Sequence, residues 1–264
     1  MNILEKIAAN KAREVEFRKK VIPRPLLENT QLYKRPTFSL ADSLVSSDFG
    51  IIAEHKRRSP SRPIINQSLP VADVVQGYAK AGVSGISVLT DTTYFGGSVD
   101  DLIISRAAVS VPLLRKEFIL DDYQVIEAKC AGADAILLLA CMLKPYEIKR
   151  FAVLAMSLGM EVLLEVRDLE EFERSVCPEI SLVGVNNRNL KDFSTDVETS
   201  FRLAEHIPSE FVKISESGLH DVNTVIALRS AGYRGFLMGE HFMKTQNPGQ
   251  AALHFINDLS AITT

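Results

Sequence analysis

From about Gly50 to the end of the chain, short apolar runs alternate with segments of helical spacing. Within a run the apolar residues are mostly consecutive, which is typical of parallel strands that are covered on both faces. The runs begin at Gly50, Gly85, Val111, Asp134, Glu161, Ser181, Phe211 and Arg234. Eight such strands, each followed by a helix, close into a barrel. We therefore predict an α/β fold, a (β/α)8 barrel.

Apolar residues spaced three and four apart predict a helix after each run. The predicted helices cover residues 71–81, 99–108, 122–131, 145–158, 169–175, 196–206, 221–231 and 248–259. Glycine directly follows several of them, where a helix often ends on a residue with positive φ; these are Gly82, Gly132, Gly159 and Gly232. A doubly wound open sheet is the alternative, but no strand leads into a GxGxxG turn. We expect residues 49–264 to form the barrel domain.

Residues 1–48 lie outside this repeat and predict an N-terminal helical extension. The spacing of apolar residues predicts a moderately amphipathic helix from Ile3, which Pro23 and Pro25 end, and a second short helix capped by Thr37. The extension either plugs the bottom of the barrel or covers a helix, or else it forms a lid near a substrate. The sequence favours neither role strongly.

Composition narrows the function classes. The 264 residues are 46% hydrophobic and carry a net charge of -3, which predicts no general attraction to nucleic acid or anionic membranes. No signal-like apolar region and no membrane span of about eighteen apolar residues is present in the sequence. Cys130, Cys141 and Cys177 are odd in number and lack metal-ligand spacing. We expect a soluble, cytoplasmic protein with reduced thiols and no metal site, a monomer or, as the alternative, a weak dimer.

Polar residues gather at the C-terminal ends of the predicted strands, where barrel enzymes carry their chemistry. In the first strand, Glu54 and Lys56 project to the same side because side chains alternate with period two, and His55 points away from it. The later strands end in Lys116, Glu165, Asn186, Glu216 with Ser217, and Gly239 with Glu240.

Two lysines and several carboxylates at one mouth have to pair with one another or with a ligand, because unpaired buried charge is costly. A partly desolvated lysine beside a second cation loses proton affinity and can act as an acid, while a carboxylate shielded from water becomes a better base. The pattern predicts proton transfer on an anionic substrate. A purely structural ring of ion pairs is the alternative.

A phosphate site is predicted beside these charges. Residues 215–218 (SESG) and Gly239 close the last two strands with glycines that let backbone N–H groups approach an anion, and residues 239–244 predict a short extra helix. Either glycine alone is explained by turn chemistry. The candidate phosphate cup comprises Arg58, Ser59, Ser61, Gly218, Gly239 and Glu240.

These residues, in this order and spacing, resemble the indole-3-glycerol phosphate synthase family. The resemblance covers nearly the whole chain, through AEHKRRSPS, SVLTDTTYFGGS, LLRKEFILDDYQ, LLEV, GVNNRNL, SESG and GE at the ends of strands 1, 2, 3, 5, 6, 7 and 8. The departures are modest. Glu117 stands where the family usually has Asp, Asn189 where Asp is frequent, and Arg62 and Pro63 where a glycine often follows SPS.

The resemblance implies closure of 1-(2-carboxyphenylamino)-1-deoxyribulose 5-phosphate to indole-3-glycerol phosphate, with loss of CO2 and water, in tryptophan biosynthesis. It implies no cofactor. By motif, Lys116 would protonate the substrate carbonyl, and Glu165 would act as a base or stabilise the positive nitrogen. Lys56, paired with Glu54, would hold the substrate carboxylate and deliver a proton in the dehydration. The division of acid and base work among these four residues stays open.

The remaining implied roles concern binding. Asn186 and Ser217 would hold the sugar hydroxyls, and Glu216 is a candidate for binding or support. The phosphate would lie against Arg58, Ser59, Gly218, Gly239 and the backbone of Glu240.

Two other functions compete with this assignment. A sugar-phosphate isomerase barrel, such as phosphoribosylanthranilate isomerase, would share the phosphate cup, but it typically uses a Cys and Asp pair and does not explain two lysines and an extension. A non-catalytic module that binds a phosphorylated metabolite would not need the acid and base set of Glu54, Lys56, Lys116 and Glu165.

Overall fold

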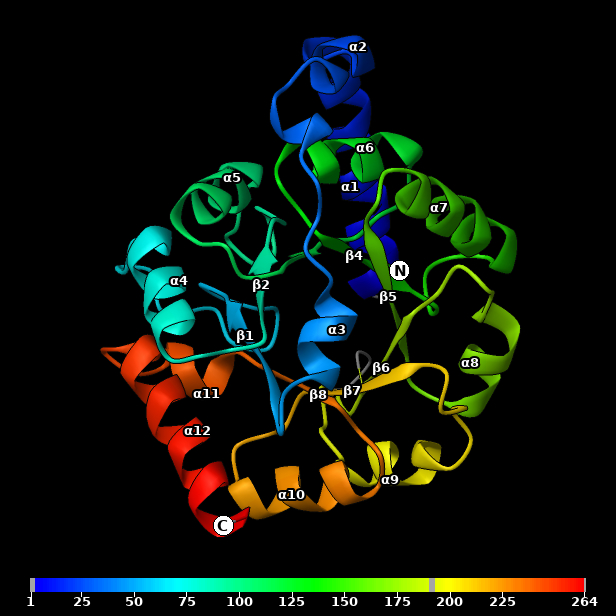
Figure 1. Ribbon diagram of the computed structural model, residues 1–264. Coiled ribbons are helices and arrows are strands. Elements are labelled where there is room, and N and C mark those ends of the chain that lie inside the picture. The colour runs from blue at the N-terminus through cyan, green and yellow to red at the C-terminus, as the bar shows by residue number, and fades with distance from the viewer. Residues whose placement is uncertain (1–2, 190–192, 264) are drawn as a thin grey trace.

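Parallel strands close into a barrel in sequence order in the computed structural model, which describes residues 3–189 and 193–263 (Figure 1). The strands are β1 (Gly50–His55), β2 (Gly85–Leu89), β3 (Leu113–Lys116), β4 (Ala135–Leu139), β5 (Glu161–Val166), β6 (Leu182–Asn186), β7 (Val212–Glu216) and β8 (Gly235–Met238). Closure occurs because β1 pairs with both β2 and β8. The predicted barrel is confirmed, and the open sheet is excluded.

Helices ring the strands and follow each of them (Figure 1). They are α4 (Val71–Lys80), α5 (Val99–Ala108), α6 (Asp122–Cys130), α7 (Pro145–Ser157), α8 (Leu169–Ser175), α9 (Glu198–Ala204), α10 (Val222–Ser230) and α12 (Pro248–Thr263), with the short α11 (Glu240–Met243) before α12. The glycines expected to end helices have positive φ: Gly82 82°, Gly132 91°, Gly159 76° and Gly232 96°. Among the described residues, no helix is long and apolar enough to cross a membrane.

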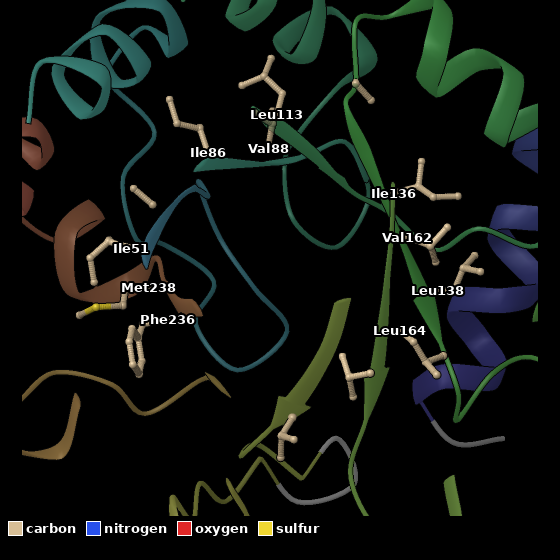
Figure 2. Close-up of a cluster of buried hydrophobic side chains, with 14 of the residues drawn as sticks. Ile51, Ile86, Val88, Leu113, Ile136, Leu138, Val162, Leu164, Phe236 and Met238 are labelled. Carbon is tan, nitrogen blue, oxygen red and sulfur yellow. The ribbon is translucent and has the colours of Figure 1, made fainter. Parts of the chain in front are cut away.

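Strand side chains alternate between two cores because successive residues face opposite sides of a sheet. Figure 2 shows the outer core, where side chains from several strands point toward the helices; labelled are Ile51, Ile86, Val88, Leu113, Ile136, Leu138, Val162, Leu164, Phe236 and Met238. Ile52, Leu114 and Leu163 belong to the inner core. Two residues further along the same strands lie the charged groups of the predicted site. The apolar layer therefore forms the floor beneath a charged layer.

The extension contains α1 (Ile3–Val21), α2 (Arg24–Glu28), the 3-10 helix η1 (Leu32–Lys34) and α3 (Leu40–Val45). The prediction missed α2, because Pro25 occupies the first turn of a helix, where the missing N–H is not needed. The predicted cap of α3 was wrong by two residues. Ser39 accepts a hydrogen bond from the Asp42 N–H, whereas the Thr37 hydroxyl donates to the Gly159 carbonyl. The boundary of the barrel domain stays a prediction.

Different helices of the extension cover the two ends of the barrel. Leu40 and Leu44 of α3 are fully buried in the inner core, and α3 lies over the centre of the barrel in Figure 1. Glu161 at the start of β5 fixes α3 by accepting hydrogen bonds from two backbone N–H groups, at Leu40 (2.8 Å) and Ala41 (3.0 Å). At the other end, α1 lines a pocket through apolar side chains. The extension therefore does both things considered from the sequence: α3 plugs the N-terminal end of the barrel, and α1 lies beside the pocket at the C-terminal end.

Candidate active site

A pocket of about 390 Å³ opens at the C-terminal ends of the strands. The predicted site residues that line it are Glu54, Lys56, Ser59, Lys116, Glu165, Asn186, Glu216, Ser217, Gly218, Gly239 and Glu240. Arg58 is not among the described residues of its wall. The Arg58 guanidinium donates instead to the carbonyls of Thr92, at 2.9 Å, and Thr93, at 3.1 Å, and so holds the loop after β2.

Lys116 lies among carboxylates in this pocket. Its ammonium donates to Glu216 Oε2 and lies 3.3 Å from Glu165 Oε2. Burial lowers the pKa of Lys116, but attraction by Glu216, Glu165 and Glu54 outweighs burial and raises the pKa above the ordinary lysine value. The expectation that Lys116 loses proton affinity was therefore wrong for the free protein, because its charged neighbours are carboxylates rather than a second cation. Lys116 carries its proton at neutral pH.

Glu54 and Lys56 form a separate ion pair on the pocket wall, with Lys56 Nζ 2.6 Å from Glu54 Oε1. Burial raises the pKa of Glu54, but Lys56 and Lys116 outweigh it and the pKa lies below the ordinary value. Gly239 lets the backbone pass close to this carboxylate, since a Cβ there would lie 2.7 Å from Glu54 Oε1. Glu54 therefore stays ionised and fixes the Lys56 ammonium at the mouth.

Glu216 is a carboxyl that can hold a proton near neutral pH. Burial is the largest effect and raises the pKa of Glu216 to about 7, even though Lys116 opposes it. Its Oε1 atom has no hydrogen-bond partner among the described residues, and Gly184 leaves room for that atom because a Cβ would overlap it. Near neutral pH, Glu216 can therefore both accept and release a proton.

Both carboxylate oxygens of Glu165 are held in place. Asn186 Nδ2 donates to Glu165 Oε1 at 2.8 Å, and Lys116 contacts the other oxygen. Asn186 is oriented in turn, because its side-chain oxygen accepts a hydrogen bond from the Arg188 N–H at 2.9 Å. Glu165 is thus a buried, oriented base candidate beside the Lys116 ammonium.

Backbone conformation shapes the predicted phosphate cup. Ser217 and Gly218 both have positive φ, 71° and 77°, which is unusual for serine. The hydroxyls of Ser59 and Ser61 lie 3.1 Å apart on the opposite loop. Glu240 pairs at 3.1 Å with Arg62, a residue that departs from the family pattern. The small residues leave space for an anion at the rim between β7, β8 and the loop after β1. The serine hydroxyls there can donate hydrogen bonds to it.

His55 is buried outside the pocket wall, as its place between Glu54 and Lys56 predicts. Burial, assisted by Arg57, lowers its pKa to about 4. Its imidazole is therefore neutral at physiological pH.

Several parts of the wall were missed by the sequence analysis. Phe95 and Phe118, with ring centroids 5.9 Å apart, line the pocket together with Arg188. The period-two rule would have found two of them, since Phe118 follows Lys116 by two residues and Arg188 follows Asn186 by two. No comparable spacing in the sequence indicated that Ile3, Leu4 and Ile7 of α1 line the pocket. Of the GVNNRNL motif, Leu190 lies outside the described residues.

Comparisons with known proteins agree with this geometry. A family model described as Indole-3-glycerol phosphate synthase matches residues 4–255. The chain is 46% identical to indole-3-glycerol phosphate synthase of Bacteroides thetaiotaomicron over 97% of this chain and 98% of that protein. It is 40% identical to the same enzyme of Carboxydothermus hydrogenoformans, over 94% of this chain and 97% of the relative.

A solved structure, thiamine phosphate pyrophosphorylase from Pyrococcus furiosus, matches with a TM-score of 0.61 at 14% identity, over 86% of this chain and 100% of that chain. At this identity the likeness shows the barrel fold alone. The family model and the relatives, in contrast, span nearly the whole chain and every strand end that lines the pocket. The chain belongs to the indole-3-glycerol phosphate synthase family, carboxy-lyases of tryptophan biosynthesis.

Proposed function

We propose that the pocket residues predicted from the strand ends carry out this family's reaction, the decarboxylating ring closure and dehydration of 1-(2-carboxyphenylamino)-1-deoxyribulose 5-phosphate. The single observation that carries the proposal is the Lys116 ammonium, held by Glu165 and Glu216 inside a pocket that is also lined by aromatic and aliphatic side chains. Such a pocket suits an aromatic ring beside a group that must gain a proton.

Lys116 is the proton donor in ring closure. The ring carbon that bears the carboxylate attacks the ketone carbon of the sugar chain, and the ketone oxygen takes a proton as it gains negative charge. Lys116 is fully protonated beforehand, and the alkoxide-like oxygen that forms is more basic than an amine, so the transfer is favourable late in the step. Glu216, hydrogen-bonded to the same ammonium, can return the proton.

Lys56 and Glu165 act on the rest of the reaction. The Lys56 ammonium, oriented by Glu54, pairs with the substrate carboxylate until CO2 leaves and its bonding electrons restore the aromatic ring. The ring nitrogen becomes positively charged on closure, and the Glu165 carboxylate stabilises that charge. In the dehydration, Lys56 protonates the leaving hydroxyl and Glu165 accepts the proton lost from carbon. Water exclusion by the apolar wall strengthens each of these interactions.

The sugar phosphate binds at the opposite rim of the pocket. Asn186 and Ser217 hold the sugar hydroxyls, and the Ser59 hydroxyl with the backbone of Gly218, Gly239 and Glu240 holds the phosphate. Arg188 lines the same pocket and adds a cation. Phosphate binding by the Arg58 guanidinium stays a prediction, since that group is engaged with the loop after β2.

Purified protein incubated with the carboxyphenylamino substrate should produce indole absorbance without any added cofactor. The matched control is the same substrate without phosphate, which should bind far more weakly because charge-assisted hydrogen bonds contribute about 1.5 to 3 kcal/mol each. Absence of indole formation would refute the proposed reaction. Equal KM values for the two substrates would remove the phosphate cup while leaving the ring-closing residues untouched.

Replacing Glu216 by Gln should change how both activity and stability depend on pH. The pKa of Glu216 is raised from its ordinary 4.5 to about 7 in the folded protein. Its protonated form therefore adds stability that is fully present below about pH 4.5 and is lost as the pH rises through about 7. Gln stays neutral, so the melting temperature of the variant relative to that of the original protein should rise as the pH increases from about 4.5 to about 7 and stay constant above that. The pH profile of kcat/KM should lose its inflection near neutrality.

The control for this experiment is Glu240→Gln, which removes a carboxylate from the exposed rim of the same pocket. Its pH profile should match that of the original protein. An unchanged inflection in the Glu216→Gln variant would assign the titration to another group.

A further inference from the structure

We propose that Lys11 of the N-terminal helix α1 is a positioning residue, which holds the helix and the chain segment after Lys116 in one arrangement around the pocket. The inference rests on the proposed role of Lys116. Lys11 is 1% exposed, and its Nζ lies 2.8 Å from Glu14 Oε2, 3.0 Å from Asp91 Oδ2 and 3.1 Å from Glu117 Oε1. The contact with Asp91 is an ion pair without hydrogen-bond geometry.

The place of Lys11 on α1 is unexpected for a charge. The buried residues of α1 are Ile7, Lys11 and Val15, spaced four apart along one face. An apolar side chain in the middle of that stripe would dock the helix at least as stably, because the desolvation of a buried ion pair offsets much of its attraction. A lysine instead restricts the helix to the one arrangement in which its ammonium meets its carboxylates. The contacts of Lys11 therefore fix the orientation of α1 rather than increase the stability with which α1 packs on the barrel.

Two of the three carboxylates that Lys11 contacts, Asp91 and Glu117, lie just after the ends of strands β2 and β3 at the pocket, and the third, Glu14, lies on α1 itself. Glu117 directly follows Lys116 and itself lines the pocket. Its other oxygen accepts a hydrogen bond from the Thr90 hydroxyl at 2.8 Å, and its Oε1 accepts one from the Phe118 N–H at 2.8 Å. Glu117 therefore fixes the backbone on the C-terminal side of Lys116, and Lys11 fixes Glu117.

Asp91 organises the neighbouring loop. Its Oδ1 accepts hydrogen bonds from the N–H groups of Tyr94, at 2.7 Å, and Phe95, at 3.2 Å, while Oδ2 faces Lys11. Phe95 lines the pocket, and so does Ile7, one helical turn before Lys11. A single ammonium therefore ties together the apolar wall from α1, the aromatic wall from the loop after β2, and the strand end that carries Lys116.

Attraction by these carboxylates keeps Lys11 charged. Burial lowers the pKa of Lys11, but Glu117, Asp91 and Glu14 outweigh burial and raise the pKa above its ordinary value. The charge is therefore constant over the working range of the enzyme. Lys11 acts through a fixed contact and takes no part in proton transfer.

A second ion pair on α1 provides a matched control. Arg18 Nη2 lies 2.6 Å from Glu127 Oε1 on α6, two turns further along the helix from Lys11. Neither Arg18 nor Glu127 lines the pocket. Arg18 contacts neither Glu117 nor Asp91, and Glu127 keeps its second partner, the Arg115 guanidinium at 2.7 Å, when Arg18 is removed. Loss of Arg18 therefore weakens the docking of α1 while the contacts of Lys11 remain, which separates docking from positioning.

The test compares Lys11→Met, Glu117→Gln, their double variant and Arg18→Met by steady-state kinetics and thermal melts of the full chain. Lys11→Met and Glu117→Gln should each lower kcat by about tenfold or more, with a smaller change in KM, because misplacement of the acid affects the transition state more than binding. The double variant should lose little more than the worse single variant, since both break one contact. Arg18→Met should lower the melting temperature but keep kcat within about twofold.

Two results would overturn the proposal. One is a kcat for Lys11→Met that falls no further than that of Arg18→Met at an equal loss of melting temperature. The other is independent, multiplying effects of Lys11→Met and Glu117→Gln. If Lys11→Met does not fold, Glu117→Gln alone decides, because it keeps the size of the side chain and removes only the charge that Lys11 meets; an unchanged kcat for Glu117→Gln contradicts positioning. Loss of the reaction in the unaltered protein would instead refute the proposed function itself.

Discussion

Replacing Lys116 by Met should lower kcat by about 10² to 10⁴ while substrate affinity changes much less. Methionine keeps the length and apolar bulk of the side chain but cannot donate a proton or neutralise the ketone oxygen during ring closure. The contacts of Lys116 point to the same result, because its ammonium is the cation that Glu165 and Glu216 share. Steady-state kinetics combined with titration of a substrate analogue would separate turnover from binding.

The matched control is Lys244→Met, which removes an ammonium from an exposed position of the same pocket. We expect it to change KM rather than kcat, since Lys244 lies at the rim and contacts no predicted acid or base in the described residues. Turnover of Lys116→Met within a few-fold of the original protein would make Lys116 an electrostatic neighbour only. The acid would then be Lys56.

Loss of Lys116 should also reduce stability at alkaline pH. Its removal leaves Glu165 and Glu216 without their shared cation, and two buried carboxylates in one site repel each other. The pKa of Glu216, already raised to about 7 by burial, should rise further. Melts of Lys116→Met should therefore show a steeper loss of stability with rising pH than melts of the original protein.

The strand ends could be predicted from the sequence because period-two alternation is a local property. Ile52 and Glu54 face the same side of β1, as do Leu114 and Lys116 on β3, so an apolar floor and a charged layer follow from spacing alone. The closed barrel then brings distant strand ends to one mouth. The position of Glu165 beside Glu54 and Lys116 could therefore be predicted without knowing any distance between the strands.

Contacts between distant segments could not be predicted in this way. Lys11 occupies a helix that the sequence analysis described only as amphipathic, and its carboxylate partners lie far along the chain at Asp91 and Glu117. The increased proton affinity of Lys116 likewise depends on which charges come closest in three dimensions. The contacts of Arg58 could not be predicted either, because a cationic residue in a loop can donate to backbone carbonyls instead of to a ligand.

Replacing Glu165 by Gln should lower kcat by about 10² or more, since the amide can neither accept the proton lost in dehydration nor stabilise the positive ring nitrogen. The change keeps the shape of the side chain, and Asn186 Nδ2 can still donate to its oxygen, so the fold and the sugar site should persist. Affinity for the product should change little, because indole nitrogen is neutral in the product and the charge that Glu165 stabilises exists only along the reaction.

The Glu216→Gln variant distinguishes the roles of the two carboxylates that flank Lys116, Glu165 and Glu216. If Glu165 is the base, Glu165→Gln lowers kcat at every pH, whereas Glu216→Gln mainly removes the inflection near neutrality. Glu240→Gln, at the rim, serves as the control for the loss of a negative charge from the pocket and should leave kcat within a few-fold. A Glu165→Gln variant that keeps its turnover, together with a Glu216→Gln variant that loses it at all pH values, would transfer the role of base to Glu216.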